Sequence, residues 1–269
     1  MTTPRSGVLE RRPVARVPEP GTAFWGLKIL TTGMGETTSD FLVKSFAPEL
    51  VVPIALLVLV LVLAVQLRTR AYRPARYWTT ALMVSVFGTM AADVLHVGLG
   101  VPYAVSTAAF ALVLAAVLVV WWRVEGTLSV HAVTSLRREG FYWATVMTTF
   151  ALGTAAGDLT ATGLGLGYLA SGFLFLVAFA VPGLVFLVTR SAAVATFWAA
   201  YVMTRPLGAS FADWFAVPAV RGGLDLGAGP VSGCLLLVFV AVVSAMALRA
   251  RPTRGSGSAL LVAGREGAA

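Results

Sequence analysis

Long apolar stretches alternate with short polar segments along almost the whole chain. Eight of these stretches are about 18–25 residues long, and a helix needs roughly 20 residues to cross about 30 Å of hydrocarbon. Four stretches hold no charge within their apolar runs, and these plain helices are expected at residues 50–67, 102–122, 167–189 and 229–248. The other four hold polar residues, and these marked helices are expected at residues 24–46, 77–99, 141–165 and 197–217.

A spaced motif repeats in the four marked helices. Each opens with an aromatic–Trp pair, at Phe24-Trp25, Tyr77-Trp78, Tyr142-Trp143 and Phe197-Trp198. A Gly lies ten residues after each Trp, at Gly35, Gly88, Gly153 and Gly208. Four residues after each Gly comes a small residue followed by Asp, at Ser39-Asp40, Ala92-Asp93, Gly157-Asp158 and Ala212-Asp213. Four of the seven Trp keep all these spacings, which indicates a tandem duplication of a two-helix unit.

These repeats predict an all-α integral membrane protein with eight transmembrane helices. The four units are expected at residues 23–67, 77–122, 141–189 and 197–248. Because each unit crosses the membrane twice, all four enter it in the same direction and are parallel repeats about an axis along the membrane normal. The simplest packing is a pseudo-fourfold ring of marked helices surrounded by plain ones. The tails, residues 1–22 and 249–269, are rich in Arg, Pro, Gly and Ser and are expected to be disordered.

Charge supports this topology. Only 12% of the residues are charged, against about 25% in soluble domains. The net charge is +8, and sixteen Arg fall in the tails and loops on one side of the eight-span topology, with only Lys44 and Arg221 on the other. Because basic loops stay in the cytoplasm, both termini should be cytoplasmic in a bacterial inner membrane. The charge therefore indicates the lipid bilayer as partner and argues against nucleic acid.

Catalytic signatures are missing from the sequence. We find no nucleophile elbow, phosphate loop or zinc-protease motif, and the single Cys234 excludes both an intrachain disulfide and a cysteine zinc cluster. We therefore expect no enzyme activity and no cofactor, and the sequence leaves the oligomeric state open.

Two positions of the motif have structural interpretations. Trp25, Trp78, Trp143 and Trp198 are predicted to anchor each marked helix among lipid headgroups, with ligand stacking as the alternative. The Gly-x3-small pairs place two small residues on one helix face and predict close helix packing, with a local helix break as the alternative. These packing residues are Gly35 and Ser39, Gly88 and Ala92, Gly153 and Gly157, and Gly208 and Ala212.

The aspartates favour a functional interpretation. Fifteen residues from Trp to Asp correspond to roughly 22 Å of helix, which places each Asp still at hydrocarbon depth. A carboxylate there costs at least about 2.5–3.5 kcal/mol unless it is neutralised, paired or hydrated. We predict that Asp40, Asp93, Asp158 and Asp213 line a proton or cation pathway. The alternatives are structural hydrogen bonds between helices and an anionic site for an organic cation.

Charged residues outside the motif break its fourfold pattern. Repeat 1 adds Lys28 and Glu36, and repeat 4 adds Arg205. If the first and last repeats adjoin, Arg205 lies about one turn from Glu36 in depth, which predicts a buried ion pair; Lys28 is a further candidate for charge pairing. His96 follows Asp93 by three residues on the same helix face, as a candidate proton relay or metal ligand. Glu36 and His96 thus join the predicted pathway.

The segment from Phe24 to Asp40 resembles a bacterial membrane-protein family defined by a tandem repeat of unknown function. That family is described as four repeats, each with two transmembrane regions and a characteristic Trp. The resemblance covers about residues 24–248, because all four copies keep Trp, Gly and Asp. It implies a multi-pass bacterial membrane protein but brings no activity or substrate. The Lys and Glu of the first copy are absent from the other three and do not belong to the shared core.

The sequence leaves two classes of function open. The first is a transporter or channel-like protein for a proton or small cation, in which the intramembrane carboxylates line the path and His96 favours a transition metal. The second is a non-transporting scaffold or sensor in which the aspartates only hold helices together. An enzyme that acts on lipid or an intramembrane peptide comes third, because no specific residue pattern supports it.

Overall fold

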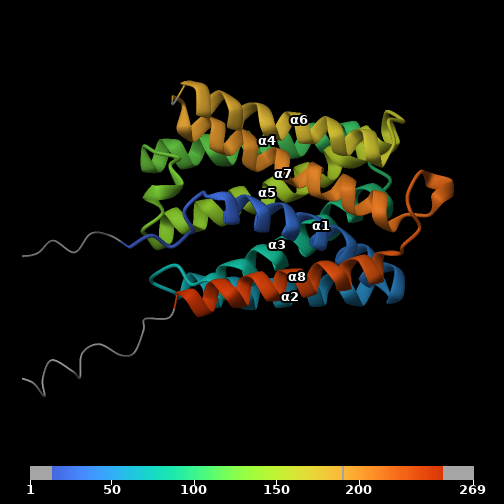
Figure 1. The fold of residues 1–269 in the computed structure, drawn as a ribbon, viewed down its shortest axis with the longest axis horizontal. Helices are drawn as coiled ribbons and strands as arrows, with labels where there is room; N and C mark the ends of the chain where they lie inside the picture. Colours follow the sequence, from blue (N-terminus) through green and yellow to red (C-terminus); the bar gives the residue numbers. More distant parts are fainter. Residues whose placement is uncertain (1–13, 190, 251–269) are drawn as a thin grey trace, which may run out of the picture.

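The computed structural model describes residues 14–189 and 191–250, and within them the backbone is helical without strands. Eight α helices run along the long axis of the molecule, with both described ends at the same end of the bundle (Figure 1). They are α1 (Thr22–Ser45), α2 (Pro48–Leu67), α3 (Pro74–Asp93), α4 (Tyr103–Glu125), α5 (Leu136–Asp158), α6 (Tyr168–Thr189), α7 (Ala193–Ala216) and α8 (Ala228–Arg249). Each has a counterpart among the expected helices.

Local sequence explains the differences in helix bounds. α5 begins at Leu136 rather than at residue 141, because Ser135 caps it by accepting a hydrogen bond from the Arg138 backbone N–H (3.3 Å). Its first turn is polar and therefore lies outside the apolar stretch. Two π-helical segments that the sequence pattern does not predict follow α3 and α5, at Val94–Gly98 (η1) and Leu159–Gly163 (η3). Short 3₁₀ turns lie at Val130–Ala132 (η2) and Ala219–Arg221 (η4).

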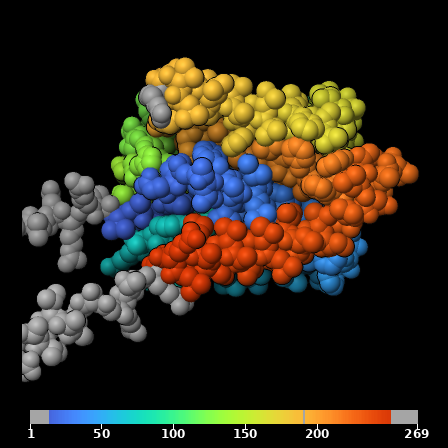
Figure 2. Space-filling model, viewed as in Figure 1, coloured from blue at the N-terminus to red at the C-terminus, as the bar shows by residue number. Residues whose placement is uncertain are grey.

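The marked helices contact one another in a closed cycle. α1 packs against α3 and α7, and α5 packs against the same two helices. Each plain helix packs mainly on the marked helix of the following repeat: α2 on α3, α4 on α5, α6 on α7, and α8 back on α1. In Figure 2, α1 accordingly lies between α8 on one side and α6 and α7 on the other. The last repeat thus completes the packing of the first.

Aromatic residues follow the same cycle. The aromatic before each Trp contacts the Trp of the next repeat: Phe24 with Trp78 (5.9 Å between ring centroids), Tyr77 with Trp143 (5.3 Å), Tyr142 with Trp198 (6.2 Å) and Phe197 with Trp25 (5.5 Å). Such tilted ring contacts are favourable beyond the area they bury. The aromatic–Trp pair is therefore an inter-repeat contact that closes one end of the bundle.

The motif glycines lie where neighbouring marked helices touch. Each faces the residue seven positions after the Trp of the next repeat: Gly35 faces Ser85, Gly88 faces Phe150, Gly153 faces Arg205, and Gly208 faces Thr32. A Cβ added at Gly153 would lie 2.2 Å from Arg205 Cγ. A Cβ added at Gly208 would lie 1.8 Å from Thr32 Oγ1 and 2.9 Å from the backbone oxygen of Ile29. The repeated Gly thus permits the close approach of four helices.

Polarity in this bundle is inverted relative to a soluble protein. Fully buried polar side chains lie between the marked helices, including Lys28, Thr89 and Arg205, whereas the plain helices expose large apolar residues such as Leu112 (72% exposed) and Leu237 (73%). Among the described residues, five helices are long and apolar enough to cross a membrane: α2, α3 with η1, α4, α6 and α8. These features are compatible with a multi-pass membrane protein, because lipid is the solvent that an apolar exterior requires.

Two expectations are corrected. Trp78, Trp143 and Trp198 are at most 5% exposed, so the prediction that their indoles lie among lipid headgroups is wrong. The aromatic cycle covers them, and Trp198 Nε1 donates to the Leu128 carbonyl (2.9 Å). Only Trp25 is partly exposed.

The predicted disorder of residues 1–22 is wrong for its described part. The Arg16 N–H donates to Val133 O, and the Tyr72 N–H donates to Ala15 O, both at 3.0 Å. Val17 belongs to the hydrophobic core. Low hydrophobicity predicted disorder, but backbone hydrogen bonds to two loops hold this segment in place. Residues 1–13 and 251–269 lie outside the described residues, so the predictions made for them stay predictions.

Gly208→Ala should destabilise the fold by about 1–3 kcal/mol, because the new methyl group meets the backbone of α1, which cannot turn away. The measurement is thermal unfolding in detergent. Gly26→Ala is the matched control, because a Cβ on this residue of α1 meets nothing within 4 Å. Equal melting temperatures for the two variants would contradict the packing role of the motif Gly.

Candidate functional site

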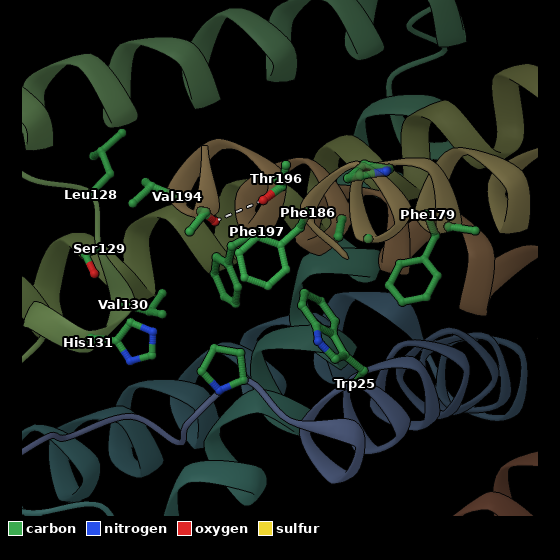
Figure 3. A pocket seen from close by; sticks show the side chains of 16 residues that line it. Trp25, Leu128, Ser129, Val130, His131, Phe179, Phe186, Val194, Thr196 and Phe197 are labelled. Atoms are coloured by element: carbon green, nitrogen blue, oxygen red, sulfur yellow. Dashed lines mark hydrogen bonds between the residues drawn. The ribbon is translucent and has the colours of Figure 1, made fainter. Parts of the chain in front are cut away.

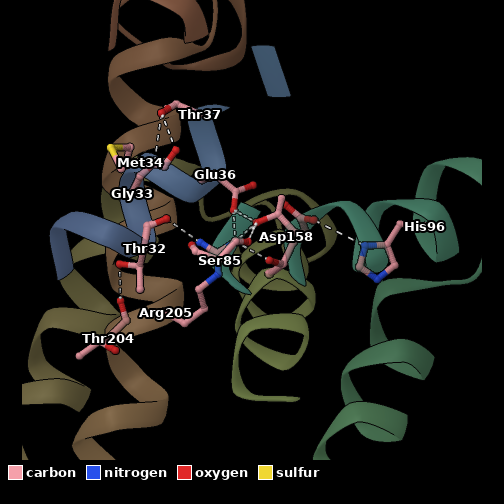
Figure 4. Close-up of polar contacts among 12 residues, drawn as sticks. Thr32, Gly33, Met34, Glu36, Thr37, Ser85, His96, Asp158, Thr204 and Arg205 are labelled. Carbon is pink, nitrogen blue, oxygen red and sulfur yellow. Dashed lines mark hydrogen bonds and ion pairs between the residues drawn. The ribbon is translucent and has the colours of Figure 1, made fainter. Parts of the chain in front are cut away.

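A buried guanidinium at the centre of the marked helices contacts all of them. Arg205 on α7 is fully buried, and its Nη2 donates to Glu36 Oε2 on α1 at 2.5 Å (Figure 4). The same nitrogen donates to Thr154 Oγ1 on α5 (2.7 Å) and to Thr89 Oγ1 on α3, and Nη1 donates to the Thr32 carbonyl (2.9 Å). The ion pair expected between Arg205 and Glu36 is present in the structure, and the two Thr partners extend it across the bundle.

The repeat explains why these partners meet. Glu36, Thr89 and Thr154 occupy the same position in repeats 1 to 3, eleven residues after the Trp. In repeat 4 that position is Ala209, and the Arg205 side chain fills the space beside it from one turn earlier. Thr89 and Thr154 were not among the residues that the sequence predicted for the site. Superposing the repeats on Glu36 could have found them, because acceptors at equivalent positions of a cyclic array face the same centre.

Lys28 does not pair with a carboxylate among the described residues, so its predicted role in charge pairing is corrected. The side chain is 1% exposed and its ammonium has no hydrogen-bond partner in the described structure. It lies 3.8 Å from the ring centroid of Phe150 and 4.3 Å from that of Tyr201. Cation–π attraction therefore replaces the ion pair. Lys28 is too near the aromatic end of α1 to reach Glu36, two turns further along.

Five carboxylates form a cluster further along the helices than Arg205. The carboxylate cluster consists of Glu36, Asp40, Asp93, Asp158 and Asp213, which interact electrostatically with one another. The four aspartates are partly exposed, whereas Glu36 is 5% exposed. Glu36 is therefore the carboxylate that interacts both with Arg205 and with the aspartates.

The aspartates are not equivalent within the cluster. Asp40 accepts a hydrogen bond from Lys44 one turn further along α1, so its charge is partly neutralised. Asp93 and Asp158 are the last residues of α3 and α5, where each helix passes into its π segment. No such segment follows Asp40 or Asp213, and the aspartates of repeats 2 and 3 therefore stand apart.

His96 joins these two aspartates. It lies in η1, and its Nδ1 is 3.6 Å from Asp158 Oδ2. A dashed line joins the two residues in Figure 4. One ligand atom each from Asp93, His96 and Asp158 lies within 4.8 Å of the others, a separation suited to a shared metal ion. The sequence predicted the proximity of His96 to Asp93 from spacing. It did not predict Asp158, because that contact depends on how repeats 2 and 3 pack.

All four repeats match one known protein family. Residues 23–72, 76–127, 141–192 and 196–252 each match the family described as Repeat of Unknown Function (DUF347). The chain belongs to this family. No curated protein and no solved structure matches it significantly. The expected resemblance is confirmed, and the four DUF347 repeats coincide with the four two-helix units.

The opposite end of the DUF347 repeats holds a second buried charge that the sequence did not predict. Glu139 on α5 is fully buried and accepts hydrogen bonds from Arg16 (2.7 Å) and from Gln66 Nε2 (2.8 Å). Trp143 Nε1 donates to it as well (3.4 Å). Arg16, expected to serve only as a cytoplasmic topology charge, instead attaches the N-terminal segment to the end of the bundle.

A cavity lies beside Trp25, the one motif Trp that is partly exposed. Its volume is about 360 Å³, and its lining includes Trp25, Phe179, Phe197 and Leu128 (Figure 3). The alternative interpretation of the motif Trp as a surface for ligand stacking therefore stays open for Trp25. The other three indoles are covered by protein.

Arg205→Met should destabilise the protein by about 3–5 kcal/mol, because it leaves Glu36 buried without its cation. The double variant with Glu36→Met should recover much of that loss, because both charges then disappear together. The measurement is unfolding in detergent, with Arg221→Met, an exposed residue, as the control. Additive losses in the double variant would contradict a coupled ion pair.

Proposed function

We propose that this DUF347 protein is a multi-pass inner-membrane transporter of a proton or small cation. In this proposal all eight helices cross the bilayer, the marked helices form a pseudo-fourfold ring, and both termini are cytoplasmic. Three marked helices, α1, α5 and α7, fall short of the apolar composition of a membrane span. These three helices need not be apolar on every face, because in the proposed ring their polar faces point inward, away from lipid. The proposal includes no catalytic step and no cofactor.

The observation that carries the proposal is the carboxylate cluster. All four marked helices contribute an Asp, and the described structure supplies this cluster with too few cations for its five carboxylates: Lys44 at Asp40 and Arg205 at Glu36. Carboxylates at hydrocarbon depth are costly unless neutralised, paired or hydrated. A bound proton or cation would supply the missing positive charge. Structural hydrogen bonding explains this surplus less well, because repeated hydroxyl or amide residues would serve the same purpose without repulsion.

A transporter fits the centre of the bundle better than an open channel. Arg205 fills the space between the marked helices and its charge repels any cation on the axis. Passage therefore requires Arg205 to move. A cation that reaches Glu36 from the aspartates competes with Arg205 for the same carboxylate, and this competition would couple binding to the opening of the Arg205 contacts with α3 and α5. A static pore offers no such coupling.

The scaffold hypothesis keeps one observation in its favour. Arg205 holds α1, α3 and α5 together through four side-chain or backbone acceptors, which is what a purely structural centre would also do. In that case the aspartates would contribute stability and no flux. The two hypotheses therefore differ in what the loss of a carboxylate changes.

Reconstitution in liposomes separates them. With an interior pH dye and a cation-sensitive dye, the wild-type protein should dissipate an imposed proton or cation gradient. Asp93→Asn and Asp158→Asn should reduce this flux to the level of empty liposomes, because a neutral amide cannot carry the charge of the passing ion. Asp225→Asn, an exposed residue after η4, is the matched control and should leave flux unchanged.

Thermal unfolding of the same variants gives the second measurement. Variants that fold like the wild type but lose flux support transport. If the wild-type protein carries no flux and the variants only have lower melting temperatures, the result supports the scaffold and contradicts transport.

A further inference from the structure

The strongest unexplained feature of the cluster is the environment of His96. Its ring is nearly buried, with 2% of the side chain exposed, and it packs edge-on against Tyr103 (4.7 Å between ring centroids). Its Nε2 lies 2.6 Å from Ser106 Oγ on α4, and its Nδ1 has no hydrogen-bond partner among the described residues. A buried nitrogen without a partner is costly, so this atom needs an explanation.

The hydrogen bonds of Ser106 permit the tautomer of His96 that a metal ligand requires, with the hydrogen on Nε2. When the Ser106 hydroxyl donates its single hydrogen to the Tyr103 carbonyl (3.0 Å), its oxygen accepts from His96 Nε2–H. Nδ1 is then the unprotonated nitrogen of the neutral imidazole. Its lone pair faces Asp158 Oδ2 at 3.6 Å, which is also an acceptor. Two lone pairs that face each other repel unless a positive ion lies between them.

We propose that Asp93, His96 and Asp158 bind one divalent first-row transition metal ion. Ligand atoms bonded to one ion at about 2.0–2.2 Å lie roughly 3–4 Å apart. The Nδ1–Oδ2 separation falls in that range, and all three ligand atoms lie within 4.8 Å of one another. Two carboxylates and a neutral imidazole balance the charge of a divalent ion, and Ser106 holds the other ring nitrogen as a typical outer partner of a metal-bound His.

The donor set selects the class of metal. One imidazole with two carboxylates suits borderline ions such as Mn²⁺, Fe²⁺, Co²⁺ and Zn²⁺, whereas Mg²⁺ and Ca²⁺ prefer oxygen alone. The absence of Cys and Met from the three-residue site argues against Cu(I). Three protein ligands leave at least one position for water. Asp158, with 23% of its side chain exposed, gives the ion access from the surface.

The backbone supports a dedicated site. π-helical turns occur frequently at functional sites, and within the described residues both π segments begin directly after the two ligand aspartates. The position equivalent to His96 is Val43, Ala161 and Ala216 in the other repeats. The site therefore forms once, between repeats 2 and 3, rather than four times.

Titration of the purified, metal-free protein in detergent tests the inference. Mn²⁺ measured by electron paramagnetic resonance and Co²⁺ measured by visible absorption should bind saturably at one site per chain, with Co²⁺ tighter than Mn²⁺ and Mg²⁺ far weaker than both. His96→Gln, Asp93→Asn and Asp158→Asn should each weaken binding by at least about tenfold, and Ser106→Ala by about 10- to 100-fold. Asp225→Asn and His131→Gln, both at exposed residues, are the matched controls and should bind as the wild type does.

A second measurement needs no variant and so does not depend on variant folding. Hydrogen peroxide added to the Fe²⁺-bound protein, with ascorbate to return Fe³⁺ to Fe²⁺, oxidises side chains next to the ion. Peptide mass spectrometry should find oxidised His96 with unmodified His131, although His131 is far more exposed. Absence of saturable binding, binding that survives all three ligand variants, or oxidation confined to His131 would each overturn the site.

If the bound metal is also the transported ion, it defines the substrate class of the proposed function. That part of the inference rests on the proposed function. Binding itself does not. Metal binding without flux would overturn transport and keep the site, whereas proton flux without metal binding would overturn the site and keep transport.

Discussion

The buried guanidinium of Arg205 is the constraint on which the bundle depends. Its acceptors lie on α1, α3 and α5, so a single side chain from α7 requires the other three marked helices to keep one mutual alignment. A buried charge without partners is far more costly than a loose helix contact. A slide or rotation of any one of these helices therefore breaks hydrogen bonds of Arg205 and raises the free energy of the folded state.

The cyclic duplication supplies the space that this centre needs. Every marked helix places its motif Gly against the next, and Gly153 lies where α5 receives the Arg205 stem. Had repeat 3 carried Ala at that position, Arg205 could not reach across the bundle. The plain helices then surround the polar interior with apolar side chains, each from the preceding repeat. Duplication thus explains both the closed packing and its apolar exterior.

Asymmetry determines where chemistry can occur. The fourfold pattern supplies an Asp to each marked helix, but only repeats 2 and 3 have π segments after it, and only repeat 2 has the His. Glu36 joins the two regions, because it contacts Arg205 on one side and interacts with the aspartates on the other. A change of charge at the aspartates can therefore reach the centre of the bundle through this one carboxylate.

The sequence by itself determined the features that depend on period and composition. Apolar length gave the eight helices, fixed spacing gave the repeats, and equal depth in adjacent repeats led to the pair of Glu36 with Arg205. These are local or translational properties that a linear pattern records. The roles of the Trp residues do not follow from local sequence. An indole fits a position among lipid headgroups as well as an aromatic core, and the packing of the surrounding helices determines which of the two it occupies.

Only the tertiary structure decided which polar groups meet. Lys28 contacts rings rather than a carboxylate, Arg16 reaches the buried Glu139, and Asp158 faces His96 from another repeat. The π segments that position Asp93 and Asp158 also have no pattern in the sequence. The physical reason is that side-chain partners across helices depend on the rotation and offset of each helix, which the packing of all the repeats sets together and no single segment encodes.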